Sequence, residues 1–182
     1  TGKGVIDGQA SNENWWSMCG SPRYGWKEGM VAQRNGGRDK LMMYAETFTP
    51  IDKRQMTFED GLRPQLINLY RCHTILIENV SLRNSPFWVI HPLFCESLTV
   101  RGVQVSSHGP NSDGCDPESS KNVLIENCVF DTGDDCIAIK SGRNADGRKW
   151  NTPSENIIVR NCEMKDGHGG VVVGSEISGG YK

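Results

Sequence analysis

Short apolar runs recur along this chain with a constant internal pattern. Four segments align without gaps, at residues 75–82, 98–105, 123–130 and 157–164, and their first residues are 23, 25 and 34 positions apart. Each opens with a mainly apolar triplet, continues with a charged residue and Asn or Gly, and then returns to Val or Cys. Because the apolar positions alternate with a period of two, each segment is predicted to be a short strand that ends in a turn.

A second set of apolar runs lies between these segments. The runs at 87–90, 136–139 and 171–173 begin 12 to 14 residues after the start of the preceding segment. Short strands in coils of about 23 residues, with turns rich in Asn, Gly and Ser, are typical of a β-solenoid whose coils stack roughly 4.8 Å apart. The predicted fold is all-β, a right-handed single-stranded parallel β-helix. An antiparallel sandwich would also have short strands, but it does not require one register to repeat on every coil.

One position of the repeat indicates how the interior packs. Four residues hold the same place in the four segments: Val80, Val103, Cys128 and Cys162. They are expected to form one buried ladder, in which packing is a better interpretation of the cysteines than a disulfide or a reactive role. Cys72 and Cys95 share a different offset, just before their segments, and are best placed for stacking or bonding.

Two stretches depart from the repeat. The insert at 142–153 lengthens the last interval and has the composition of an exposed loop, so it is expected to project from one face of the solenoid. Residues 3–8 resemble one edge of a coil, whereas 15–60 have no clear period. The latter are interpreted as a long excursion that is followed by another strand.

Composition narrows the class of protein further. The 182 residues carry a formal charge of −2 and contain no run of five Lys or Arg, which argues against a nucleic-acid partner or an anionic membrane surface. No apolar stretch approaches the roughly 18 residues needed to span a bilayer. The seven cysteines are an odd number without Cys/His metal spacing, so no metal site of that kind is predicted. The chain opens at Thr1 and stops at Lys182 without a closing element, which predicts a solenoid truncated at both ends.

Three acidic residues and one histidine occupy similar places in the repeat. Asp113 lies 15 residues after the start of its segment, Asp134 and Asp135 lie 11 and 12 after theirs, and His168 lies 11 after its own. Each precedes the second strand of its coil. Since equivalent positions of stacked coils line up along the axis, these side chains are expected to converge on one face.

The chemistry of this cluster depends on its combination of residues. Asp113 alone, within Asn-Ser-Asp-Gly, is typical of an Asx turn. The adjacent Asp134 and Asp135 place like charges side by side, which raises the pKa of at least one unless a ligand or metal uses them. His168 lies between Gly167 and Gly169, so no large neighbour covers its ring and a place in a cleft is favoured.

Three carboxylates favour glycoside hydrolysis, in which one acid protonates the leaving oxygen and a carboxylate activates water. Calcium binding is the alternative use of the same cluster. The chain contains no Gly-x-Ser-x-Gly elbow, Walker loop or Gly-x-Gly-x-x-Gly motif, so the hydrolase chemistry that depends on these motifs has no support in the sequence.

Three motifs resemble those of the polygalacturonases and their relatives in glycoside hydrolase family 28. Asn-Ser-Asp at 111–113 is similar to the family's Asn-Thr-Asp, Gly-Asp-Asp at 133–135 matches its Gly-Asp-Asp, and Gly-His-Gly at 167–169 matches its Gly-His-Gly. Their order and the 21-residue gap between Asp113 and Asp134 also agree with the family. The resemblance runs from 4–8 through Asn-Ser-Pro at 84–86 to the end, so it covers nearly the whole chain.

This resemblance implies a pectin lyase-like β-helix that hydrolyses α-1,4-galacturonosidic bonds with inversion and needs no cofactor or metal. By residue-to-residue transfer, Asp134 is the general acid, Asp113 and Asp135 hold and deprotonate water, and His168 supports them. Asn111, Gly167 and Gly169, in the same motifs, are expected to contact substrate. Residues 1–182 would form part of one catalytic β-helix domain that lacks its N-terminal and C-terminal coils.

The implied partner is a pectic polysaccharide, homogalacturonan or its oligomers, and the implied protein is a secreted or periplasmic monomer. The insert at 142–153 and residues 111–120 resemble bacterial exo-acting members. Two other hypotheses stay open: a calcium-dependent pectate lyase on the same solenoid, and a non-catalytic carbohydrate-binding β-helix.

One expected element is missing from the chain. The family's Arg-x-Lys motif, which binds the galacturonate carboxylate, should follow Gly-His-Gly by a further coil. Arg38-Asp39-Lys40 matches the Arg-x-Lys pattern but precedes the coils that carry the acids, so it is interpreted as a solvated loop. Lys140 is a candidate replacement cation, the alternative being an exposed strand end. His91, on the coil before Asp113, is a weaker subsite candidate.

Overall fold

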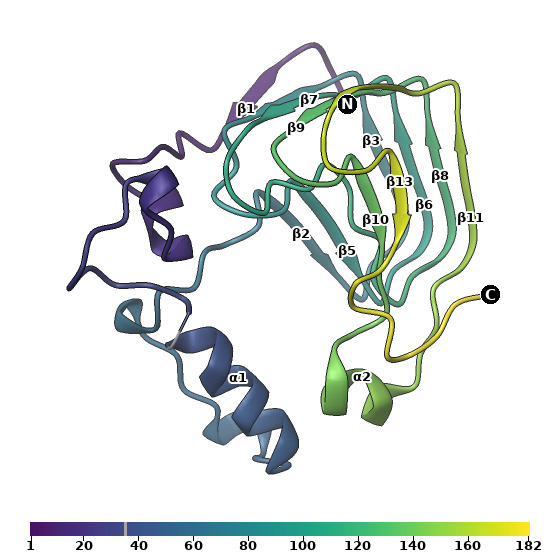
Figure 1. The fold of residues 1–182 in the computed structure, drawn as a ribbon. Helices are drawn as coiled ribbons and strands as arrows, with labels where there is room; N and C mark the ends of the chain where they lie inside the picture. The colour runs from purple at the N-terminus through teal and green to yellow at the C-terminus, as the bar shows by residue number, and fades with distance from the viewer. Residues whose placement is uncertain (35) are drawn as a thin grey trace.

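The chain folds into the parallel β-helix that the repeat predicts. A computed structural model describes residues 1–34 and 36–182, and its strands stack in successive coils around a common axis (Figure 1). Every pairing between named strands is parallel within the described part of the chain. The same residues also contain no helix with both the length and the apolar character needed to cross a membrane.

Three stacks of strands form the walls of the coils. The first stack has the order β1 (Val5–Asp7), β4 (Ser81–Arg83), β7 (Gln104–Ser107), β9 (Val129–Thr132) and β12 (Glu163–Asp166). The second has the order β3 (His73–Glu78), β6 (Glu96–Arg101), β8 (Lys121–Glu126) and β11 (Glu155–Arg160). The third contains the pairs β2 (Ile67–Tyr70) with β5 (Ile90–Leu93) and β10 (Ile137–Ile139) with β13 (Val171–Val173). Cys115 joins these two pairs by bridging Ile90 and Ile137.

Inward-facing side chains of successive coils form one apolar core. Phe130 of β9 is fully buried, and the register places it between Val105 of β7 and Met164 of β12. Burying a side chain of this size contributes about 1.5–3 kcal/mol. The expected ladder is present, since Val103 and Cys128 belong to the core and Val80 and Cys162 pack against it.

The cysteines of the described chain are all free thiols, and the ladder cysteines Cys128 and Cys162 pack in the core or against it. Cys72 and Cys95 form no disulfide, and their thiols donate to backbone carbonyl oxygens, that of Cys72 to Tyr70 and that of Cys95 to Leu69.

A row of left-handed residues turns the chain at the end of each strand of the second stack. Asn79, Gly102, Asn127 and Asn161 have φ angles of 57°, 60°, 54° and 53°. In this region a Cβ approaches the following carbonyl oxygen, so Gly and Asn are favoured. The backbone N–H of Asn127 donates to the carbonyl oxygen of Arg160 on the next coil, at 3.2 Å. This explains the Asn or Gly found in every copy of the repeat.

Two irregular segments contain helices that the sequence did not predict. Between β1 and β2 lie α1 (Gly37–Glu46) and four short 3₁₀ helices: Trp16–Cys19, Pro22–Tyr24, Ile51–Lys53 and Phe58–Asp60. The insert forms α2 (Asn144–Trp150), so the prediction of an exposed loop at this position was wrong. Its Asn, Asp and Gly have low helix propensity, and tertiary contacts override that preference. The two helices lie side by side outside the solenoid (Figure 1), and Arg54 Nη1 is 2.8 Å from Asp146 Oδ2.

We expect the substitution Asn127→Val to lower the free energy of unfolding by about 1–2 kcal/mol, because a β-branched residue is strained at this φ. Thermal unfolding of the variant measures the loss. Asn127→Gly should stay close to wild type, and Thr99→Val, on strand β6, provides a control in extended backbone. Equal melting temperatures for Asn127→Val and Thr99→Val would contradict the prediction.

Candidate active site

A cleft of about 760 Å³ lies where the third stack of strands faces the segment between β1 and β2. One side is formed by residues of that segment, among them Gln33, Arg38 and Arg63. The other side is formed by coil residues: Phe87, Trp88, Asn111, Asp113, Glu118, Asp134, Asp135, Lys140 and residues 172–176. The cleft therefore combines a repeating wall with an irregular one.

The three aspartates converge on this cleft, as their places in the repeat predict. Asp113 lies between β7 and β8, and Asp134 and Asp135 lie between β9 and β10. Each carboxyl offers one oxygen that lies within 4.8 Å of those of the other two. Backbone hydrogen bonds hold the coils in place here, because the N–H of Gly114 donates to the carbonyl oxygen of Asp135 at 2.9 Å.

Asp134 is held from two sides. His168 Nδ1 is 3.1 Å from one oxygen of Asp134, and the His168 side chain is 73% exposed, so it covers the acid from the solvent side. Asn111 Nδ2 donates to the other oxygen at 3.4 Å. Arg63 Nη2 donates to Asn111 Oδ1 at 2.7 Å, which fixes the orientation of the amide so that its NH₂ group faces Asp134.

Burial and repulsion raise the pKa of the two flanking aspartates. The pKa of Asp113 is raised to about 7, by burial first and then by the charge of Asp134, while Lys140 acts in the opposite direction. The pKa of Asp135 is also raised, by burial and by Asp134, with Lys140 and His168 opposing. Neutral pH is therefore close to the titration range of Asp113, a condition suited to proton exchange with substrate or water.

Lys140 is the buried cation of the site and not an exposed strand end. Its side chain is 4% exposed, and its Nζ lies 3.6 Å from Asp113 Oδ2, 3.8 Å from Asp116 Oδ2 and 3.0 Å from Glu176 Oε2. Burial lowers the pKa of Lys140, but these three carboxyls more than offset it and the net shift is upward. The ammonium also lies 4.8 Å from the centre of the Trp88 ring.

Other cations reach the cleft from the irregular segments. Arg38 and Arg143 line it, together with the buried Arg63. The interpretation of Arg38-Asp39-Lys40 as a solvated loop was wrong, because these residues form the first turn of α1 and present Arg38 to the cleft. Arg143 Nη1 is 3.4 Å from Glu176 Oε1 and its side chain is 51% exposed, so part of its hydrogen-bonding capacity is free for a ligand.

The remaining predicted residues lie behind the cleft. His91 is buried and is not among the lining residues, and it reaches the cleft through two residues that are: its Nε2 lies 2.6 Å from Glu118 Oε2, and its ring packs edge-on against Trp88. Gly167 has a φ of 154°, and a Cβ there would lie 2.8 Å from Cys136 Sγ, so its role is close packing. Gly169 accepts a hydrogen bond from Cys136 N–H and supports Asp135 from the next coil.

Several functional residues were missed by the sequence reasoning: Arg38, Arg63, Trp88, Asp116, Arg143 and Glu176. Asp116 follows Asp113 by three positions on the same turn, and it could have been found from the sequence. Two acids this close together repel each other, as Asp134 and Asp135 do, and therefore predict a raised pKa. The arginines belong to segments without a repeat, so no register could place them.

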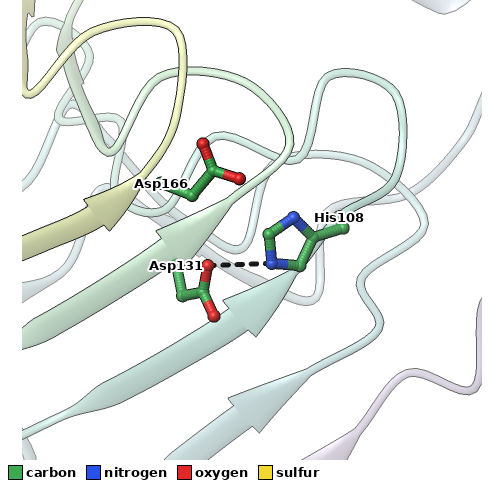
Figure 2. A group of neighbouring side chains, drawn as sticks. All are labelled: His108, Asp131 and Asp166. Carbon is green, nitrogen blue, oxygen red and sulfur yellow. Dashed lines mark ion pairs between the residues drawn. The ribbon is translucent and has the colours of Figure 1, made fainter.

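Two groups of side chains have the composition of a metal site. The first is the active-site trio of aspartates, where Lys140 already supplies a positive charge. The second is His108, Asp131 and Asp166 at the ends of β7, β9 and β12 (Figure 2), where His108 Nε2 lies 2.9 Å from Asp131 Oδ1. None of this second group lines the cleft.

The family profile of glycosyl hydrolases family 28 matches residues 52–182. The chain belongs to this family. A crystal structure of a hyperthermoactive exopolygalacturonase from Thermotoga maritima is 49% identical to this family 28 chain, with a TM-score of 0.97 over 100% of this chain and 41% of that one. The exo-poly-alpha-D-galacturonosidase of Dickeya chrysanthemi is 30% identical over 98% of this chain and 30% of its own length. A polygalacturonase structure from Erwinia carotovora ssp. carotovora is 25% identical, with a TM-score of 0.61 over 94% of this chain and 40% of that one. The chain thus spans less than half the length of each of these relatives.

We expect Lys140→Met to lower the free energy of unfolding by about 3–5 kcal/mol at pH 7, because buried carboxyls lose their counter-charge. The penalty should shrink towards pH 4, since the carboxyls are then protonated in the unfolded chain as well and folding requires no proton uptake. Unfolding measured at both pH values tests this. Lys121→Met removes an exposed ion pair with Glu96 and should cost about 0–1 kcal/mol. An equal loss for Lys140→Met at both pH values would contradict the assignment.

Proposed function

We propose that this chain carries the catalytic site of a hydrolase that cleaves α-1,4-galacturonosidic bonds of pectin or polygalacturonate. The observation that carries the proposal is the group of three aspartates with His168 beside a cleft that also contains arginines. Membership of family 28 and the likeness to proteins named as polygalacturonases support it. The substrate is a polyanion, and the cations lining the cleft match its charge.

Asp134 is the general acid in this proposal. It contacts both Asn111 and His168, and its side chain is 23% exposed, against 5% for Asp113, so a glycosidic oxygen can reach it. Its proton passes to that oxygen as the bond from the anomeric carbon breaks, and the bonding electrons leave with the oxygen.

Asp113 and Asp135 bind and deprotonate the attacking water. A water that makes two hydrogen bonds of 2.5–3.0 Å can join oxygens up to roughly 5 Å apart, and the nearest oxygens here lie within 4.8 Å. The water oxygen bonds to the anomeric carbon and its proton moves to one of these carboxylates. These steps balance without a metal or cofactor.

Inversion at the anomeric carbon is supported by the resemblance to family 28. The nearest oxygens are closer than the roughly 6.5–9.5 Å between carboxyl groups that is typical of an inverting pair, so the distance alone does not choose the stereochemical course. The anomer formed first, followed by NMR, distinguishes inversion from retention.

Exo action is supported by the segments that surround the cleft and by the two relatives named as exo-enzymes. The segment between β1 and β2, with α1, forms one wall, and its Arg54 is tied to α2 of the insert. A walled groove favours binding of a chain end over the middle of a polymer. We further propose a monomer that works outside the cytoplasm, in the periplasm or after secretion, where its polymeric substrate is found.

We expect Asp134→Asn to lower kcat on polygalacturonate by about 10²–10⁴-fold, because the amide cannot donate a proton to the leaving oxygen. Release of reducing ends by the full chain measures the loss. The control is Asp131→Asn, an acid on the same coil that pairs with His108 and lies outside the cleft, which should retain activity.

Two results would overturn the proposed function, and a third would exclude its exo action. Chelator-sensitive activity that yields an unsaturated product absorbing in the ultraviolet would indicate the lyase. Polymer binding without bond cleavage would indicate a binding module. Mixed oligomers as first products, in place of mono- or digalacturonate, would exclude exo action alone.

We expect Arg143→Ala to raise KM for polygalacturonate roughly tenfold with a smaller change in kcat, because a charge-assisted contact with a substrate carboxylate is lost. Added salt should reduce the difference between variant and wild type. Arg148→Ala, on α2 and 62% exposed, removes a charge away from the cleft and should leave KM unchanged. A KM effect as large for Arg148→Ala would show a non-specific charge effect.

A further inference from the structure

Asp116 is a buried acid that the proposed mechanism does not use. Its residue is 0% exposed, and among the described residues no N–H or O–H group donates to either of its carboxyl oxygens. A buried carboxylate without hydrogen bonds is strongly destabilised, so the group must be compensated by a nearby charge or by a proton.

One nearby cation does not balance the charges. Lys140 Nζ is 3.8 Å from Asp116 but closer to Asp113 and Glu176, and it donates hydrogen bonds only to Glu176 and to the carbonyl oxygen of Gly174. Arg143 Nη1 adds a second cation at 3.4 Å from Glu176 Oε1, so three ionised carboxyls would still leave one buried negative charge uncompensated. At least one of these acids must therefore be protonated in the folded protein at neutral pH.

The geometry selects Asp116 as the protonated acid. Lys140 Nζ lies 3.6 Å from Asp113 Oδ2 and 3.8 Å from Asp116 Oδ2, so the two buried carboxyls are neighbours, and neighbouring carboxyls can form a hydrogen bond with each other only if one is protonated. Asp113 borders the cleft, whereas Asp116 is fully enclosed. The pKa of Asp116 is raised well above the usual range by burial, then by Asp113, with Glu118 adding and Lys140 opposing.

We propose that Asp116 is a positioning residue that stays protonated and donates a hydrogen bond to Asp113, so that Asp113 remains an anion able to accept the proton of water. This inference rests on the proposed hydrolytic function for its catalytic consequence. The hydrogen bond fixes one Asp113 oxygen towards the interior and leaves the other for water. Four groups act on the ionisation of Asp113: Asp134 and Asp135 oppose it, and Asp116 and Lys140 favour it.

The test compares two variants of Asp116 in the full chain. Asp116→Asn keeps a neutral N–H donor of the same shape, so kcat/KM on polygalacturonate should stay within about threefold of wild type. Asp116→Leu cannot donate, so the ascending limb of the pH profile of kcat/KM should move up by about one pH unit. Activity at pH 6 should then fall about tenfold and recover towards alkaline pH. Equal damage by both variants would overturn the proposal, as would a Leu variant with an unshifted pH profile.

A stability readout separates this inference from the proposed function. Wild-type Asp116 must take up a proton on folding at pH 7, because an aspartate in the unfolded chain is ionised there, whereas at pH 4, close to the ordinary aspartate pKa of about 3.9, roughly half of the unfolded chains already carry that proton. Asp116→Asn removes that requirement. Its melting temperature should exceed that of wild type at pH 7 by more than at pH 4.

A lower melting temperature for Asp116→Asn at pH 7, or the same difference at both pH values, would overturn the proposal even if the chain cleaves no polymer. Conversely, an inactive wild type with the expected stability pattern would refute the proposed function and leave Asp116 protonated. This second measurement also covers the case in which Asp116→Leu does not fold.

Discussion

The parallel hydrogen-bond register between coils is the constraint on which the site depends. The N–H of Val89 donates to Asp113, that of Gly114 to Asp135, and that of Cys136 to Gly169, so an unbroken ladder passes through the catalytic turns. Parallel strands lie roughly 4.8 Å apart, and residues about 20 positions apart in sequence are thereby brought within contact distance. A slip of one residue would send each side chain to the opposite face. The geometry of the acids is thus a property of the fold and not of a flexible loop.

The same register creates an electrostatic problem that the molecule must solve. Stacked coils place like side chains above one another, and acids that recur in one position repel. Lys140 neutralises part of this charge, and its own burial is tolerated because carboxyls surround it. The rest of the repulsion stays in the site, where burial and the charge of Asp134 raise the pKa of both Asp113 and Asp135. A catalytic cluster of this kind is destabilising by itself and relies on the apolar rows of the core for stability.

The features of the fold and the site that could be predicted from the sequence are those that the repeat of the coils determines. The strands, the ladder through Val80 and Cys128 and the convergence of Asp113, Asp134 and His168 could all be predicted, because a repeat converts sequence offset into position in space. Helices α1 and α2 could not, since neither segment repeats and the composition of α2 favours a loop. The burial of a side chain could not be predicted either. The sequence around Lys140 is compatible with an exposed strand end and with a buried cation, and only the packing of Trp88 and Glu176 around the ammonium shows that it is buried.

Acids and arginines of the cleft come from different parts of the chain, and the reason is again the register. In the turns that carry Asp113, Asp134 and Asp135, the register stacks acids on neighbouring coils. Among the described residues, the arginines that line the cleft lie outside the coils: Arg38 and Arg63 between β1 and β2, and Arg143 between β10 and β11. Such segments can change length and charge without shifting a single inter-coil hydrogen bond. The charge of the irregular wall can therefore vary while the positions of the three aspartates stay constant.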